Sequence, residues 1–190
     1  MGKNITSELE DKLSKFMELS LQDIKVELAD EFDRNFEREA FFTDKWARRK
    51  YNDDESRQLL INSGTLRSSI TDKDKFATKT KNSVIFETAV PYAKVHNDGG
   101  TIIVTKRMKA FFWYKYKAAI GAKTFKRNGS QRNDKKNRLL NSDAEFYRGM
   151  ALKPVGSKII IPKRQFIGKH PEVNKILKEI IENNIQTIFK

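Results

Sequence analysis

Residues 7–40 read SELEDKLSKFMELSLQDIKVELADEFDRNFEREA, a stretch without glycine or proline. Its apolar side chains recur at three-, four- and five-residue steps, a spacing that keeps them on one side of a helix: Leu9, Leu13, Phe16, Leu21, Ile24, Leu28, Phe32 and Phe36. We predict one long helix over this range, opened by a capping box in which Ser7 and Glu10 each satisfy a backbone amide. Such a helix is about 50 Å long, more than a small sheet covers. Either its end packs on another subunit or it breaks near Asp30.

The remaining sequence alternates between short strand-like and longer helix-like segments. The period-2 and β-branched segments predict four strands, at 76–81, 83–90, 101–105 and 157–161. Helical spacing predicts an amphipathic helix over 106–120 and a last helix opened by His170-Pro171. The order of these elements predicts an α+β fold. We expect a long N-terminal helix, a small antiparallel sheet of about four strands, and a C-terminal amphipathic helix.

Positive charge is concentrated in one segment. The 190-residue chain has 38 Lys and Arg against 25 Asp and Glu, a net charge of +13. Residues 106–141 hold 12 of these basic residues and a single acidic one. We expect residues 1–40 to form the long helix and residues 41–190 an α+β domain with this basic segment as an insertion. Within it, residues 123–141 lack periodicity and predict a mobile, poorly ordered loop.

The basic segment also carries aromatic residues, and three interpretations stay open. Its cations and aromatic rings suit a nucleic-acid backbone with stacked bases. Alternatively, the rings face the core while the lysines are solvated, or an acidic protein surface docks here. The candidate contacts for an anion or partner are Lys106, Arg107, Lys109, Lys115, Lys117, Lys126, Arg127, Lys135 and Lys136.

Composition and motifs argue against catalysis. There is no cysteine and there are only 2 histidines, so disulfides, thiolate chemistry and zinc sites built on cysteine are excluded. No nucleotide-binding, zinc-protease or nucleophile-elbow motif occurs. His96 lies near Asp98, but no nucleophile accompanies them, so we interpret His96 as structural. We expect no enzyme activity, no metal, no cofactor, and no membrane-spanning segment or signal peptide.

Three short motifs occur in a fixed order: LLINSGTLRSSI at 59–70, VPYAKVHNDG at 90–99 and IPKRQFIG at 161–168. A fourth segment, VTKRMKAFFW at 104–113, lies between the second and the third, and aromatic Phe41, Phe42 and Trp46 precede the first. This ordered set resembles the Mu-like phage virion morphogenesis family, which includes tail completion and head–tail joining proteins. The resemblance covers residues 36–190. Three features depart from the family pattern. Gln165 stands where the family usually has proline. The other two are Asp98-Gly99-Gly100 and the long basic loop.

Each motif also has a physical interpretation. Gly64 suits a positive φ, and Arg67 has a planar fork able to bind a carboxylate or carbonyl. We expect Arg67 to bond a backbone carbonyl of the second motif, or Asp98. Tyr92 and His96, four residues apart, share one face of a helical turn. The full set of candidate structural residues is Gly64, Leu66, Arg67, Pro91, Tyr92, His96, Gly99, Pro162, Arg164, Phe166 and Gly168.

The resemblance implies a structural protein of a tailed phage or prophage. It implies assembly in the bacterial cytoplasm followed by incorporation into the virion. The implied partners are other tail or neck proteins and further copies of the same chain, with at most weak, non-specific contact with DNA. The runner-up function is a nucleic-acid-binding protein that uses residues 106–141.

Overall fold

The structure is a computed structural model that describes residues 5–49, 58–61 and 63–190. The chain forms two compact units. The first comprises Met1–Ala47, Ser56–Asp98 and Lys163–Lys190, and the second comprises Arg48–Glu55 and Gly99–Pro162. This grouping differs from the expected division at residue 40, because the long helix shares its core with the segments that follow it.

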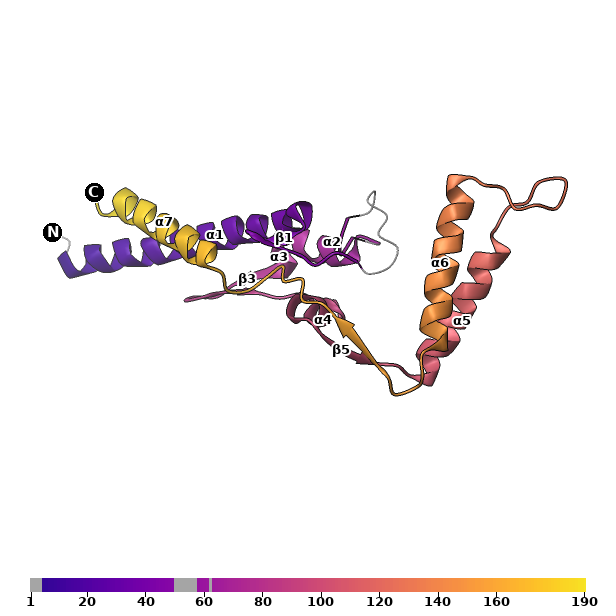
Figure 1. Ribbon diagram of the computed structural model, residues 1–190. Helices are drawn as coiled ribbons and strands as arrows, with labels where there is room; N and C mark the ends of the chain where they lie inside the picture. Colours follow the sequence, from indigo (N-terminus) through magenta and orange to yellow (C-terminus); the bar gives the residue numbers. More distant parts are fainter. Residues whose placement is uncertain (1–4, 50–57, 62) are drawn as a thin grey trace. The chain divides into compact units, whose positions relative to one another are not determined.

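Helix α1 runs without a break over Ile5–Arg38, 34 residues, so the predicted long helix is confirmed (Figure 1). Asp30 lies inside it and no break occurs there. The predicted capping box is wrong, because the helix already includes Ile5 and Thr6 and places Ser7 within its first turn.

The carboxyl-terminal half of α1 supplies the core of the first unit. Helix α1 packs against α7, Pro171–Ile188. The two helices are antiparallel: the His170 ring stacks 4.8 Å from the Phe42 ring just beyond the end of α1, whereas Phe189 contacts Phe16. His170 caps α7 as expected, its Nδ1 accepting a hydrogen bond from the Glu172 amide at 3.2 Å. The most deeply buried large apolar side chains of this unit are Phe36, Ile70, Phe76 and Phe166.

The described strands form three separate two-stranded antiparallel ladders, which corrects the expected single sheet of about four strands. Strand β3 pairs with β4, and β5 pairs with β6. Phe86 of β4 contacts Phe32 of α1, so the first of these ladders packs on the long helix, while β5 and β6 belong to the second unit. The six strands are β1 Ala40–Phe41, β2 Asp44–Lys45, β3 Ala77–Lys79, β4 Val84–Phe86, β5 Gly100–Ile103 and β6 Lys158–Ile161.

Three short helices complete the first unit: α2 Thr65–Thr71, α3 Lys73–Phe76 and α4 Ala93–Asp98. The last of these includes most of the helical turn expected after Pro91. Between β3 and β4, the Thr80 amide donates to the Ser83 carbonyl at 2.8 Å, which closes a turn at Lys81-Asn82.

The second unit is dominated by a helical hairpin of α5, Lys106–Gly121, and α6, Lys135–Leu152. The amphipathic helix over 106–120 is therefore confirmed, but the prediction of a loop over 123–141 is wrong from residue 135 onward. Asp134 begins α6 by accepting the Asn137 amide at 2.8 Å. The apolar spacing that stabilises α6 continues past the expected loop, because Phe146 and Tyr147 pack on Phe112 of α5.

No helix within the described ranges is long and apolar enough to cross a bilayer.

Candidate functional site: a motif junction and a basic helical hairpin

The second and third motifs are joined in the first unit by one side chain, Asn97. Its Oδ1 accepts the amides of Phe166 at 3.0 Å and Ile167 at 3.1 Å. Beside it, the His96 carbonyl accepts the Arg164 amide at 2.8 Å. A single helical turn, α4, therefore holds three residues of the third motif, Arg164, Phe166 and Ile167.

The aromatic region before the first motif holds the same segment from another side. Trp46 donates its indole N–H to the Gln165 carbonyl at 2.6 Å, and Asn35 of α1 donates to the Phe166 carbonyl at 3.3 Å. The Arg164 guanidinium donates to the Ala47 carbonyl at 2.9 Å. We call the set Asn35, Trp46, Asn97, Arg164 and Phe166 the motif junction.

The motif junction is buried except for Asn97, which is half-buried. Phe166 and Asn35 are 0% exposed and Arg164 is 8% exposed. Because a buried polar group without a partner is costly, these hydrogen bonds define one conformation for the segment. At its end Gly168 has φ 131°, and a Cβ there would lie 2.7 Å from the Gln165 side chain. The expectation that Phe166 is a core anchor is confirmed.

Arg67 is bound differently from the expectation. Its guanidinium binds Asp33 of α1 instead of the second motif or Asp98. The Nε atom donates to Asp33 Oδ1 at 2.9 Å, and a terminal nitrogen donates to Oδ2 at 2.9 Å. A third bond of 2.6 Å reaches Glu37. The hydrogen bonds from Arg67 lower the pKa of Asp33 and raise the pKa of Arg67. The expectation failed because the two carboxylates stand one helical turn apart on α1, facing α2.

Gly64 precedes α2 as its N-cap residue with φ 78°, a positive φ as expected. Leu66, two residues later, is buried in the core. Their motif therefore attaches α2 to α1 through an apolar contact and an ion pair.

His96 faces the interior of the first unit. Its ring lies 6.0 Å from that of Tyr92, so the expected shared face is confirmed. Burial, and in addition the positive charge of Arg164, lower the pKa of His96. Pro91 precedes this helical turn, Gly99 follows it with φ 72°, and Pro162 follows β6.

The candidate cations all lie on the α5–α6 hairpin of the second unit. Helix α5 carries Lys106, Arg107, Lys109, Lys115 and Lys117; the connection between the helices carries Lys126 and Arg127; and the first turn of α6 carries Lys135 and Lys136. All except Lys109 and Lys115, which are half-buried, are exposed. The hairpin thus presents a positively charged surface along its whole length.

The connection between the helices, residues 123–134, is a structured turn that we call the tip loop. Asn137 of α6, 1% exposed, organises it: its side chain accepts the Thr124 amide at 3.0 Å and donates to the carbonyls of Thr124 at 2.8 Å and Arg132 at 2.7 Å. The Lys126 amide closes the turn on the Ser130 carbonyl at 2.8 Å. The exposed Phe125 stands beside Lys126 and Arg127.

The aromatic residues of α5 divide between two environments. Phe112 packs against α6, as the core interpretation predicts. Phe111 and Tyr114 are exposed, Tyr114 at 69%, as the binding interpretation predicts.

Three asparagines, Asn35, Asn97 and Asn137, are the residues that sequence reasoning missed. Asn97 lay inside a quoted motif, and Asn35 and Asn137 lay within helix-like or loop-like segments that gave no signal of burial. Among the described residues, no three His, Asp or Glu side chains are grouped as ligands for a metal ion.

No family model, no curated protein and no solved structure matches the chain.

Proposed function

We propose that the chain is a structural protein of a tailed phage or prophage that acts in virion morphogenesis, in tail completion or head–tail joining. Its partners in this role are other tail or neck proteins and further copies of itself. It acts in the host cytoplasm during assembly and then remains in the virion. The role rests on protein–protein contacts and requires no cofactor.

The convergence at the motif junction is the observation that supports this proposal most. The second and third motifs are separated by more than 60 residues, yet Asn97 bonds directly to Phe166 and Ile167. Trp46, from the aromatic region before the first motif, bonds to Gln165. Two of the motifs that carry the resemblance and the aromatic region therefore meet at one place in the first unit, which supports the proposal.

Deletion of the gene from the phage or prophage that carries it tests the proposal. Electron microscopy of the induced lysate should show heads and tails accumulating separately, and a plasmid copy should restore joined particles. A plasmid copy with Asn97→Ala should restore fewer, since it weakens the motif junction. Normal numbers of joined, infectious particles without the gene would refute the proposal.

Nucleic-acid binding is the second candidate, favoured by the exposed Phe125 beside Lys126 and Arg127 in the tip loop. An aromatic ring next to cations suits stacking on a base and contact with phosphates. Fluorescence anisotropy with duplex DNA at several salt concentrations separates the candidates. We expect weak binding without sequence preference that vanishes near physiological salt. Tight binding at about 0.2 M salt, abolished by serine at Lys126, Arg127, Lys135 and Lys136, would favour the second candidate.

A further inference from the structure

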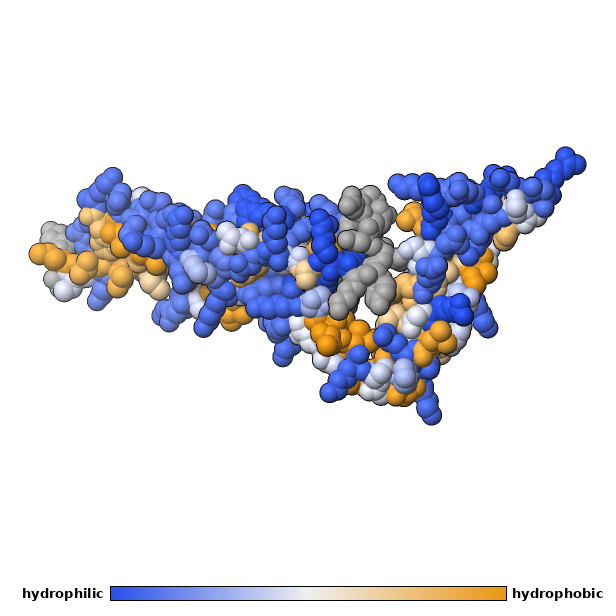
Figure 2. Space-filling model, in the orientation of Figure 1, coloured by the Kyte–Doolittle hydropathy of each residue, from blue (hydrophilic) through white to orange (hydrophobic). Residues whose placement is uncertain are grey.

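The amino-terminal end of α1 carries an apolar stripe without a partner among the described residues. Ile5, Leu9, Leu13 and Met17 follow one another at four-residue steps and are exposed, Leu9 at 58% and Leu13 at 53%. They are neighbours on one helix face, which we call the α1 stripe. Figure 2 shows hydrophobic surface gathered at the end of the first unit where α1 begins and α7 ends.

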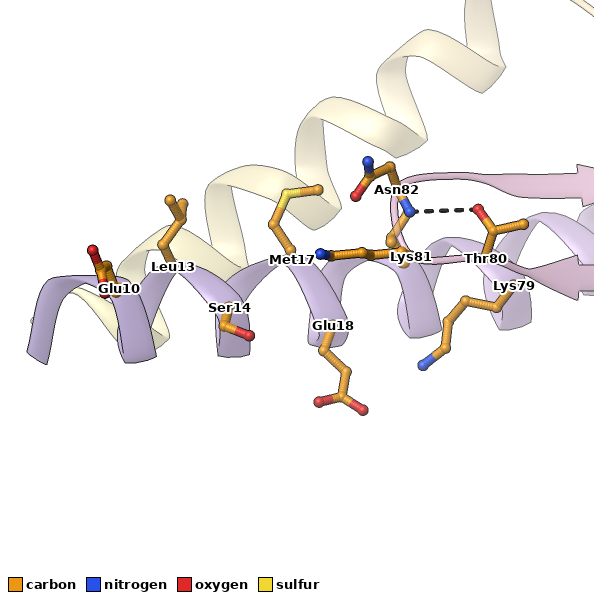
Figure 3. Close-up of a pocket in the computed structure, with 10 residues that line it drawn as sticks. Glu10, Leu13, Ser14, Met17, Glu18, Lys79, Thr80, Lys81 and Asn82 are labelled. Carbon is orange, nitrogen blue, oxygen red and sulfur yellow. Dashed lines mark hydrogen bonds between the residues drawn. The ribbon is translucent and has the colours of Figure 1, made fainter. Parts of the chain in front are cut away.

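A groove runs along part of this stripe. Leu13, Met17 and Leu21 line it from α1, and the turn between β3 and β4, residues 79–82, forms its other wall. Leu13 and Met17 point to the same side as Asn82, whereas Glu18 and Lys79 point away (Figure 3). The apolar side chains are therefore accessible from outside.

The part of α1 that carries the α1 stripe has a net negative charge. The first 19 residues of α1, 5–23, contain five acidic side chains, among them Glu10 and Glu18, and two lysines. The opposite wall of the groove adds Lys79 and Lys81. The helix that carries the stripe is thus negative, so a partner that brings positive charge to it is favoured.

Helix α5 of the second unit has the complementary surface. Arg107, Phe111, Tyr114 and Ala118, at steps of four, three and four residues, share one face and are exposed. We call this set the α5 face. The helix contains five Lys or Arg and no acidic residue, so its exposed aromatic rings lie in a positive surrounding.

We infer that the α1 stripe of one copy packs against the α5 face of a second copy. Opposite charges align the two surfaces, and one repeated contact covers both apolar faces. Pairing of two α1 stripes instead would bring together two acidic helices and would leave the α5 face uncovered. The contact joins two different surfaces, so each copy keeps one face free to bind the next. This inference stands independently of the role in virion assembly.

Two variants that each remove one surface test the inference. Leu9→Lys with Leu13→Lys makes the α1 stripe polar and positive, and Tyr114→Glu with Lys117→Glu makes the α5 face negative. All four side chains are exposed, so folding should be retained. In sedimentation velocity over a micromolar concentration series, we expect the wild type to associate. Each variant alone should associate about a hundredfold more weakly or more.

Mixing the two variants gives the decisive result. The first keeps an intact α5 face and the second an intact α1 stripe, so the mixture should form a dimer of one copy of each that cannot grow further. Gln22→Lys with Val26→Lys on α1, and Lys126→Glu with Arg127→Glu in the tip loop, are matched controls that should associate like the wild type.

Several outcomes would overturn the inference. A wild type that stays monomeric over the whole concentration series would overturn it. This includes the case in which the α1 stripe and the α5 face pack against each other within one chain. Variants that still associate like the wild type would overturn it, as would two monomeric variants whose mixture stays monomeric, which would indicate pairing of like surfaces. If DNA and not a second copy of the chain covered the α5 face, that face would be assigned to nucleic-acid binding.

Discussion

Asn97 binds two residues of the third motif through a single oxygen, so its removal should be costly. Asn97→Ala leaves the amides of Phe166 and Ile167 without their acceptor in a part-buried site. We expect a loss of about 1–3 kcal/mol in the free energy of unfolding, measured by urea denaturation. Asn97→Asp keeps an acceptor oxygen and should lose less. Equal stability of Asn97→Ala and the wild type would contradict the role assigned to this side chain.

Arg67 binds two carboxylates of α1 with a geometry that lysine cannot reproduce. Its side chain is 27% exposed and that of Asp33 is 23% exposed, so solvent screens the pair only in part. Arg67→Ala should cost about 1–3 kcal/mol, and Arg67→Lys should recover only part of this loss. Urea unfolding at neutral pH measures both. Full recovery by lysine would show that charge alone matters.

His96 should make the stability depend on pH in the weakly acidic range. Its pKa in the folded chain lies below the ordinary 6.5, because of burial and then of Arg164, so the unfolded chain takes up the proton first. The contribution of His96 is present above about pH 6.5 and is lost as the pH falls toward the folded pKa. The urea midpoint should therefore fall more between about pH 7.5 and 5.5 in the wild type than in His96→Gln. Equal falls in the urea midpoints of the wild type and His96→Gln would contradict this role of His96.

At the scale of elements, the tip loop and the start of α6 carry charge that contributes little to folding. Lys126, Arg127, Lys135 and Lys136 are exposed, and the last two lie at the positive end of the α6 dipole. Serine at all four positions should leave the melting temperature almost unchanged, as measured by calorimetry. A large fall would mean that these side chains make stabilising contacts.

The sequence predicts the long helix, the C-terminal helix and the positions of the strands. These depend on periodicity and on the proline and glycine residues that end helices and strands, which are local properties of the sequence. The separation of the strands into three ladders instead of one sheet was not predictable, because which ladder each strand joins depends on what α1 and the second unit cover. The start of α6 was not predictable for a related reason: its first residues are basic and polar, and the aromatic residues that pack the helix on α5, Phe146 and Tyr147, lie beyond Asn141.

In the candidate site too, contacts within one segment were predictable and contacts between distant segments were not. Gly64, Phe166 and the Tyr92–His96 pair were predictable, since each depends on backbone conformation or on spacing within one segment. The partner of Arg67 was not, because Asp33 and Glu37 lie about 30 residues away and their proximity requires the fold. Likewise, no local pattern distinguishes the buried Asn35 and the half-buried Asn97 from solvated asparagines.

On the scale of the whole molecule, the two units have different compositions and different proposed tasks. The first contains the motif junction and the α1 stripe, and the second contains the basic hairpin. The net charge of +13 arises almost entirely from the second unit, so charge-driven contacts are expected there and apolar, motif-based contacts in the first. The proposed role in virion assembly assigns protein contacts to both units.

Complementation in vitro tests this account most directly. Extract from a phage lysate that lacks the gene supplies separate heads and tails, and purified protein is added before infectious particles are counted. We predict that the wild type raises the titre by several orders of magnitude and that the variant with serine at the four tip-loop and α6 cations does so equally well. No rise in titre with folded wild-type protein would contradict the proposed role in virion morphogenesis.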